Sequence, residues 1–383
     1  MKEAIIALDG GGSNLRMIVV DKNTEEEIYF REINSGTNLS TVPNKEQALN
    51  NIKRLIADGY TSLPSDYTLV GIGLSSAGTE IPENQSSLEQ ALQDVVEILK
   101  KFSDKIATHP PELYVTNDID ILLHSADIAL VAGTGTVCAV KYKDIKPYDN
   151  TDEIPEEYTI EKLDAAGPHI GDKGSGFWLG KEVLTKVQEI ETLGGFINSK
   201  GEFVEEHNSY LRELVLNKLF SLTGISGDVA EKAKILGLKE AGAPEFVSLV
   251  YSATEDDGKV FDRAKVGNLF AILANEAALQ GDEAANDILK AASIELFKNI
   301  RVAYEKGSFA DKEDCRLLLS GSVLVHNKII RFFLENAIRD YYPNIIIKIN
   351  TEQPVHSTVK YIKEKLKTRT LPEFPEDNGG INR

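Results

Sequence analysis

One stretch decides how the rest of the chain is interpreted: Ala4-Ile5-Ile6-Ala7-Leu8-Asp9-Gly10-Gly11-Gly12-Ser13-Asn14-Leu15-Arg16-Met17-Ile18-Val19-Val20-Asp21. Its order predicts a strand that ends on an aspartate, a tight glycine turn and a returning strand. Backbone N–H groups in such a turn, beside one carboxylate, suit a phosphate chain and its magnesium ion. A strand rather than a helix follows the glycines, which separates this loop from the dinucleotide fingerprint and the P-loop. A plain hairpin turn is the alternative.

Composition narrows the class of protein and of partner. The chain has 383 residues, 42% of them hydrophobic and 27% charged, as in a globular protein with room for two domains. Its net charge of -18 argues against nucleic acid and anionic membranes as partners. The two cysteines, Cys138 and Cys315, form neither a disulfide framework nor a metal-type pair. With no signal peptide and no apolar run near the ~20 residues of a membrane helix, we expect a cytoplasmic protein.

Strands alternate with helices along the chain, which predicts an α/β layer architecture. An apolar strand over 67–74 runs into Ser75-Ser76-Ala77-Gly78, and a short strand over 113–116 runs into Asn117-Asp118 and a helical stretch. The pattern then begins again with a strand over 127–132, a turn over 133–136 and a strand over 137–141. We interpret the acidic stretch 142–161 as a surface excursion.

Four turns of glycine and small residues follow predicted strands or precede predicted helices: 9–13, 133–136, 171–176 and 320–322. Each alone could be an ordinary turn. Split across two α/β units, they are better explained as the walls of one nucleotide cleft.

These motifs, in this order and over nearly the whole chain, resemble the superfamily of actin, the 70-kDa heat-shock chaperones and the sugar kinases. The resemblance is closer to the N-acetylglucosamine kinase branch, grouped with the BadF/BadG/BcrA/BcrD ATPase family. It rests on Leu8–Ser13, Gly73–Gly78, Thr116–Asp118, Ala132–Thr136, Gly167–Ser175 and Leu319–Ser322. It implies two ribonuclease-H-like domains with ATP between them. We place the first in 1–123 with the C-terminal helix 355–383, and the second, with helical insertions, in 124–354.

The resemblance also implies site residues. Asp9 would hold Mg2+ through water, and the ATP contacts would come from Gly11, Gly12, Ser13, Gly133, Thr134, Gly135, Gly321 and Ser322. The sugar would be bound by Asn38, Ser76, Asp118 and Asp172. Asp118 would be the catalytic base that takes the proton of the sugar hydroxyl, although Asn-Asp before a helix is also an ordinary N-cap.

The expected function is ATP-dependent phosphorylation of the primary hydroxyl of a hexosamine or related sugar, N-acetylglucosamine or a relative. We expect a homodimer, as in many members of the family. The alternatives are an ATPase activator of a dehydratase or reductase, of the iron–sulfur type, and a non-catalytic sugar-sensing relative. The chain retains Asp9 and Asp118, which argues against a non-catalytic relative.

Departures from the family pattern leave the sugar open. Ala166 stands where the family has tryptophan, and Lys173 stands where it has glutamate. The lysine could favour an acidic sugar, contact phosphate or simply be solvated. Asn14 replaces a basic residue, and Ser357-Thr358 replaces Gly-Ala in the final helix.

Overall fold

The computed structural model describes residues 1–11, 14–143, 158–164, 167, 170–206, 208–222, 243–254 and 263–368. It divides into two compact units, which we call unit 1 (Met1–His124 with Glu352–Arg383) and unit 2 (Ser125–Thr351). Each unit is built around one five-stranded mixed sheet.

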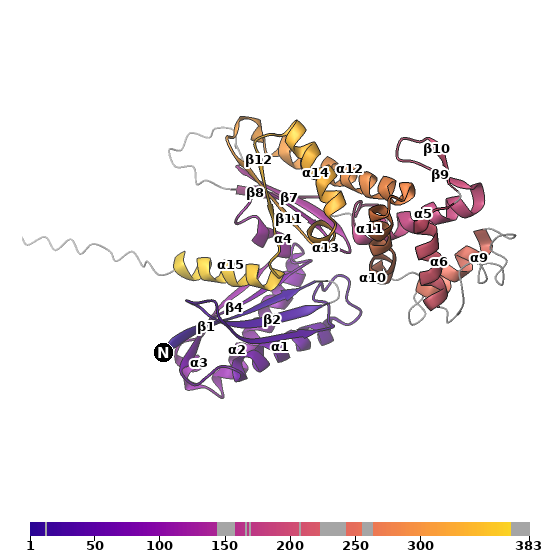
Figure 1. Ribbon diagram of the computed structural model, residues 1–383. Coiled ribbons are helices and arrows are strands. Elements are labelled where there is room, and N and C mark those ends of the chain that lie inside the picture. Colours follow the sequence, from indigo (N-terminus) through magenta and orange to yellow (C-terminus); the bar gives the residue numbers. More distant parts are fainter. Residues whose placement is uncertain are drawn as a thin grey trace, which may run out of the picture. The chain divides into compact units, whose positions relative to one another are not determined.

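The sheet of unit 1 has the order β3-β2-β1-β4-β5 (Figure 1). Its strands are β1 (Lys2–Gly10), β2 (Leu15–Asp21), β3 (Glu27–Ile33), β4 (Tyr67–Ser76) and β5 (Glu112–Thr116). The first three strands are antiparallel neighbours, whereas β4 and β5 run parallel to β1. The helices of this unit are α1 (Lys45–Thr61), α2 (Pro82–Lys100), α3 (Asp104–Thr108), α4 (Asp118–Leu122) and α15 (Pro354–Thr368).

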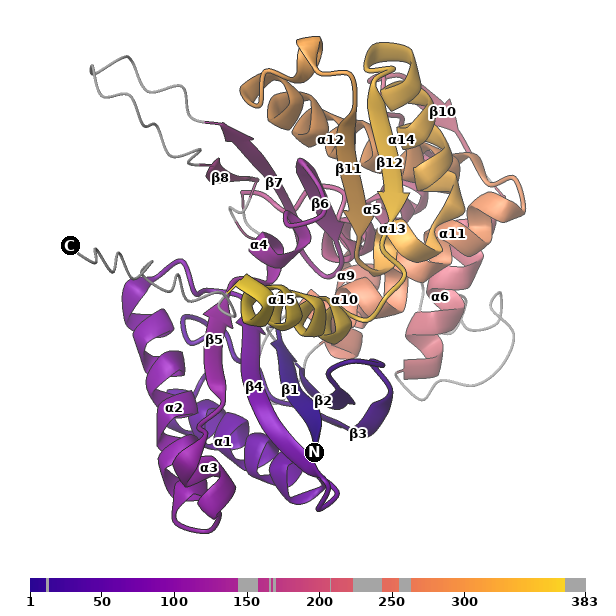
Figure 2. The same ribbon diagram turned by 90° about the vertical axis from the view of Figure 1, so that its left-hand side faces the viewer.

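Both faces of this sheet are covered, which explains why β1 is apolar without alternation. Ala4, Ile6 and Leu8 share a core with α1 and α2, and Ile5 and Ala7 share another with α15. Figure 2 shows α15 crossing the sheet on the face opposite α1 and α2. A Cβ at Gly73 of β4 would lie 2.5 Å from Cδ1 of Ile362, so the absence of a side chain lets α15 approach closely.

The sheet of unit 2 has the order β12-β11-β6-β7-β8. Its strands are β6 (Ile128–Ala132), β7 (Thr136–Lys143), β8 (Tyr158–Leu163), β11 (Cys315–Ser320) and β12 (Ile345–Ile349). Here too β6, β7 and β8 are antiparallel neighbours, and β11 and β12 run parallel to β6. The two sheets therefore have the same strand order and directions, with β6 in the place of β1.

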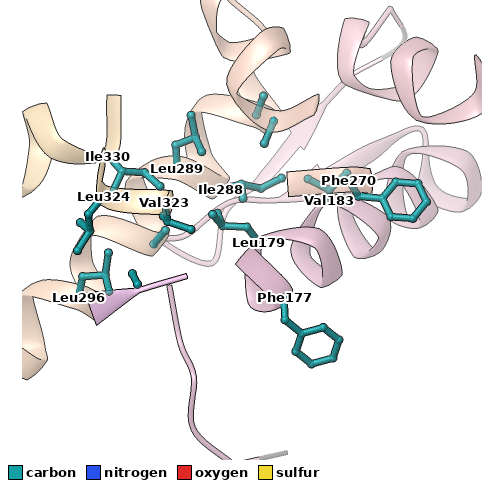
Figure 3. Close-up of a cluster of buried hydrophobic side chains, with 14 of the residues drawn as sticks. Phe177, Leu179, Val183, Phe270, Ile288, Leu289, Leu296, Val323, Leu324 and Ile330 are labelled. Carbon is teal, nitrogen blue, oxygen red and sulfur yellow. The ribbon is translucent and has the colours of Figure 1, made fainter. Parts of the chain in front are cut away.

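Unit 2 carries a larger set of helices. They are α5 (Gly176–Leu193), α6 (Tyr210–Leu222), α9 (Ala243–Thr254), α10 (Arg263–Val266), a π-helix (Gly267–Ala271), α11 (Ile272–Leu279), α12 (Glu283–Lys306), a 3-10 turn (Phe309–Asp311), α13 (Ser322–His326) and α14 (Lys328–Tyr341). A hairpin of β9 (Gly195–Ile197) and β10 (Phe203–Glu205) lies apart from the main sheet. Side chains of α5, α12, α13 and α14 meet in one buried core, which includes Leu179, Leu296, Val323 and Ile330 (Figure 3).

The interpretation of 142–161 as a surface excursion is wrong at both ends. β7 extends to Lys143, and Tyr158–Leu163 forms β8, which pairs with β7 in antiparallel register. Residues 144–157 lie outside the described residues. The strand was missed because its six residues, of which half are polar, directly follow an acidic run.

Among the helices that the structure describes, none combines the length and the apolar character that a membrane span requires.

Candidate functional site

The carboxyl ends of the parallel strands of unit 1 bring together residues that are distant in sequence. Asp9 of β1 lies opposite Ser75 of β4, and Ser75 lies opposite Thr116 of β5. Neighbouring strands are about 4.8 Å apart, so this row is roughly 10 Å long. Asn117 and Asp118 continue directly from its end. Polar groups at this edge are where open α/β sheets bind ligands.

Asp9 is a buried carboxylate with few groups to stabilise its charge. Asp9 is 9% exposed, and the hydroxyl of Ser75 donates to its Oδ1 at 2.9 Å. Burial raises the pKa of Asp9 above its usual value, while the Ser75 hydrogen bond and the charge of Arg16 act in the opposite direction. A cation bound at this carboxylate would offset the cost of burial.

Asn38 and Ser76 lie where the loop after β3 contacts the end of β4. The hydroxyls of Thr37 and Ser76 are 2.7 Å apart and buried. Oδ1 of Asn38 accepts from the backbone N–H of Ser40, and a Cβ at Gly78 would lie 2.5 Å from that oxygen. Gly78 also has a φ of +83°, so both space and backbone conformation require glycine here.

Asn117 fixes the start of the short helix that carries Asp118. Its Oδ1 accepts from the N–H of Ile119 at 3.0 Å, as the N-cap of α4. Its Nδ2 donates to Oγ1 of Thr79 at 3.1 Å and to Oε2 of Glu80 at 2.9 Å. The capping role therefore belongs to Asn117, and Asp118 is the first helical residue beyond it.

In unit 2, Asp172 holds the glycine turn between β6 and β7. Asp172 is 5% exposed, and its Oδ1 accepts from the N–H of Thr136 at 2.9 Å. A Cβ at Gly135 would lie 3.0 Å from the same oxygen. Asp172 adopts a φ of 57°, an uncommon conformation for a non-glycine residue that often marks a functional segment. The carboxylate thus joins the 133–136 turn to the turn that precedes α5.

A cavity of about 380 Å³ opens beside this turn, within unit 2. Its lining comes from the β6–β7 turn, the start of α5, the π-helix, α11 and α13, with the first residue before α14: Gly133, Thr134, Gly176, Leu179, Gly267, Ala271, Ile272, Asn275, Ser322, Val323, His326 and Asn327. Mostly apolar walls with a few polar side chains are typical of a small-molecule site.

Glycines make this cavity possible because they let backbone segments approach. A Cβ at Gly176 would lie 3.2 Å from the carbonyl oxygen of Gly133, and one at Gly267 would lie 3.0 Å from the carbonyl carbon of Gly176. Gly321 has a φ of +91°, and a Cβ there would lie 2.4 Å from the carbonyl oxygen of Ala132. The segment that follows β11 therefore rests on the backbone at the end of β6.

The structure places the predicted site residues in two groups. Unit 1 carries Asp9, Asn38, Ser76 and Asp118 at or just beyond its strand ends. In unit 2, Gly133, Thr134 and Ser322 line the cavity, whereas Gly135 and Gly321 support the backbone beside it, and Asp172 contacts the turn. Gly11 follows β1, its N–H donating to the carbonyl of Asn14. Gly12, Ser13 and Ala166 lie outside the described residues. The ligand contacts expected of these residues stay predictions.

Sequence reasoning missed three polar residues of the cavity, Asn275, His326 and Asn327. Asn275 lies in a helical part of the chain without a motif, and His326 and Asn327 follow the Leu319–Ser322 motif but are not part of it, so no local signal marks these three residues. Thr37 was also missed, although it is part of the polar turn that contains Asn38.

Lys173, which departs from the family pattern, has a structural partner. Nζ of Lys173 lies 3.8 Å from Oε2 of Glu295, and the lysine side chain is 55% exposed.

Both cysteines are buried in the core of unit 2. Burial raises the pKa of the Cys138 thiol, and that of Cys315 to about 12. Thiols that resist ionisation inside a core are poor ligands for an iron–sulfur cluster, which argues against the activator alternative.

No family model matches the sequence, and neither does any curated protein. Solved structures do match. A candidate N-acetylglucosamine kinase from Chromobacterium violaceum aligns with 94% of this chain and 98% of its own length, at a TM-score of 0.56 and 15% identity. A ROK family transcriptional regulator, a homologue of the E. coli MLC protein, aligns at a TM-score of 0.49 and 13% identity, covering 96% of this chain and 79% of its own. A ROK family glucokinase from Streptomyces griseus, in complex with glucose and AMPPNP, aligns at 0.44 and 13%, covering 94% and 99%.

The first of these likenesses, together with the repeated strand order, shows the fold. The chain has the two-domain actin-like ATPase fold, α/β in both domains. The predicted fold class is confirmed.

Proposed function

We propose that this protein transfers the γ-phosphoryl group of ATP to the primary hydroxyl of a hexosamine or related sugar. The observation that carries the proposal is the row of residues at the carboxyl edge of unit 1. It combines a buried carboxylate at Asp9 with the hydroxyl groups of Ser75 and Thr116, and the chain continues from its end into Asn117 and Asp118. A phosphoryl transfer to an alcohol needs a site for the metal–phosphate charge and a separate carboxylate for the hydroxyl proton.

In the proposed reaction, the carboxylate of Asp118 accepts a hydrogen bond from the sugar hydroxyl and takes its proton as the new O–P bond forms. The bond between the γ-phosphorus and the bridging oxygen of ADP breaks, and ADP leaves. Asn117 is the positioning residue, since its cap and its bonds to Thr79 and Glu80 fix the start of α4.

Asp9 would hold the magnesium ion that accompanies ATP. The protein would supply the carboxylate of Asp9; among the described residues no three His, Cys, Asp or Glu side chains gather into a metal cluster. Magnesium commonly binds in this way, with water and substrate phosphates as its other ligands. Once bound, it would neutralise charge on the β- and γ-phosphates.

The nucleotide would use the cavity of unit 2. Its volume of about 380 Å³ and its apolar walls suit a nucleoside, and its edge is formed by Gly133 and Thr134. The glycine turns would contact the phosphates, and Gly12 and Ser13 are proposed to take part from the first turn.

We further propose N-acetylglucosamine or a relative as the acceptor, and membership of the N-acetylglucosamine kinase branch of the BadF/BadG/BcrA/BcrD family. The sequence motifs support this, as does the candidate N-acetylglucosamine kinase among the similar folds. Asn38 and Ser76 supply groups that both donate and accept hydrogen bonds, as sugar hydroxyls require. We also propose a homodimer.

The test is ADP release by the full chain with MgATP and a panel of acceptors: N-acetylglucosamine, N-acetylmannosamine, N-acetylmuramic acid, glucosamine and glucose. The proposal expects one or two hexosamines to stimulate ADP release far above the rate without sugar. No stimulation by any member of the panel would contradict it.

A further inference from the structure

Asn275 is a lining residue of the cavity of unit 2, and its carboxamide is not used within the described part of the chain. It lies in the first turn of α11, directly after the π-helix, and is part of the cavity lining. Its side chain has no hydrogen-bond partner among the residues that the structure describes. A helical asparagine that lines an apolar cavity without a partner is suited to bind a polar ligand edge.

Asn327 offers a second amide, with only its donors left. Asn327 is 8% exposed, and its Oδ1 accepts from the N–H groups of Ile329 at 3.1 Å and Ile330 at 3.0 Å. These bonds cap α14 and fix which way the amide points. Nδ2 is therefore the atom of this side chain that remains for a ligand, and it can donate but not accept.

The other walls of the cavity suit the faces of a planar ring. Leu179 and Val323, whose side chains point into the same region of the core in Figure 3, contribute apolar surface, as do Ala271 and Ile272. The π-helix before Ile272 inserts one extra residue into the helical turn and so changes the direction in which Asn275 points. Gly267 lets this wall contact the start of α5.

We propose that Asn275 reads the polar edge of the purine base and makes the site selective for adenine nucleotides. This rests on the proposed use of ATP. Oδ1 of Asn275 accepts from the exocyclic amino group of adenine, and its Nδ2 donates to the adjacent ring nitrogen, a pairing that a carboxamide matches well. Nδ2 of Asn327 donates to a further acceptor of the nucleoside.

Guanine fits this pair of amides less well. Its Watson–Crick edge carries the O6 acceptor and two donors, N1–H and the N2 amino group, whereas adenine carries one amino donor and the N1 acceptor there. Asn275 supplies one amide oxygen, and the oxygen of Asn327 already accepts two backbone N–H groups. If guanine pairs with Asn275 through O6 and N1–H, its N2 amino group finds no acceptor on either amide, which lowers its affinity relative to adenine.

The experiment compares ATP with purine riboside triphosphate, which lacks only the 6-amino group. Binding of each to the full chain is measured by calorimetry for the wild type, for Asn275→Leu and for Asn336→Leu. Asn336 is the matched control, since it lies on α14 outside the cavity. The wild type and Asn336→Leu should prefer ATP by about tenfold, the usual effect of one hydrogen bond. Asn275→Leu should bind both ligands within about twofold.

Asn275→Asp gives a second readout that does not depend on loss of binding. A carboxylate accepts but does not donate, so it suits the guanine edge, and the ratio of GTP to ATP affinity should rise by about tenfold. Equal binding of ATP and the purine analogue by the wild type would overturn the proposal. The proposal would also be overturned if Asn275→Leu and Asn275→Asp both bound ATP and both kept the nucleotide preference of the wild type. A wild type that binds no ATP would instead contradict the proposed function itself, and the proposal with it.

Discussion

The two units share one sheet plan but differ in the chemistry of their strand ends. In unit 1, the hairpin of β1 and β2 closes after Asp9 and Gly10, whereas in unit 2 the hairpin of β6 and β7 closes after Val131 and Ala132. By this register Val131 takes the place of the buried aspartate. The end of β5 leads into Asn117-Asp118, and the end of β12 leads into Asn350-Thr351. The repeated backbone thus supplies two equivalent edges. In unit 1 carboxylates stand on the strand end and directly after it, whereas in unit 2 the described carboxylate at this edge, Asp172, comes from the segment before α5.

Because of this difference, the two units suit different ligands. The edge of unit 1 has acids and hydroxyls that suit a metal ion and a sugar, and unit 2 has a glycine-lined cavity with amides that suits a nucleoside. Substitutions in each unit, each with its own control, can separate these roles.

The largest effect is expected for Asp118→Asn. The amide keeps the shape of the side chain but cannot take a proton, so kcat should fall by about 10² to 10⁴. Steady-state kinetics with MgATP and the best acceptor of the panel would measure this. Asp120→Asn, two residues later on the same short helix, is the matched control and should stay within about threefold of the wild type. Equal losses in both variants would remove Asp118 as the base.

Gly321→Ala should reduce stability more than the same change at another glycine of similar φ. At Gly321 the added Cβ would lie 2.4 Å from a carbonyl oxygen, and the backbone has a φ of +91°. We expect a loss of about 3 kcal/mol in the free energy of unfolding. Gly281 has a φ of +85° and nothing within 4 Å of a Cβ, so Gly281→Ala should cost only about 1 kcal/mol. Denaturant unfolding of both variants gives the comparison, and equal losses would show that the contact with Ala132 does not matter.

Asp9→Asn should stabilise the ligand-free protein while abolishing its use of magnesium. Burial raises the folded-state pKa of Asp9, so its carboxylate lowers stability at a pH above that value. At pH 7 the variant should be more stable by roughly 1 kcal/mol, the size of a desolvation penalty for one polar group. The gain should shrink as pH falls through the raised folded-state pKa and vanish below the ordinary value of 3.8, where both the folded and the unfolded state bind the proton. Thermal unfolding of the ligand-free wild type and variant at several pH values would measure this difference. A variant that is less stable than the wild type at every pH would contradict the prediction.

The smallest effect is expected for Lys173→Ala. Lys173 is exposed and pairs with Glu295, an arrangement that contributes about 0–1 kcal/mol. The ratio of kcat/KM for N-acetylmuramic acid to that for N-acetylglucosamine should change by less than about twofold. A larger fall for the acidic sugar would mean that the lysine does select the acceptor.

The sequence was sufficient for the fold because its decisive elements are local. The apolar run before Asp9, the glycine turns and the small residues after Leu74 each identify a strand end without reference to distant contacts. The short strand β8 was missed because its place is set by pairing with β7, and its own six residues carry little signal.

The site was predictable only in part, because local sequence identifies some of its residues and tertiary packing brings in the others. Asp9, Asp118 and the 133–136 turn follow strands and could be found from that position. Asn275 and Asn327 come to one cavity through the packing of α11, α13 and α14, and nothing in their local sequence indicates this. The contact of Asp172 with the N–H of Thr136 likewise depends on two segments 36 residues apart.

The most direct test of the central claim is to identify the product. The full chain, MgATP and N-acetylglucosamine or the best acceptor of the panel would be followed by phosphorus-31 NMR. The account predicts a new sugar phosphomonoester signal that grows together with ADP, needs the sugar, and is lost with Asp118→Asn. Formation of ADP and inorganic phosphate alone, whether or not a sugar is present, would contradict it.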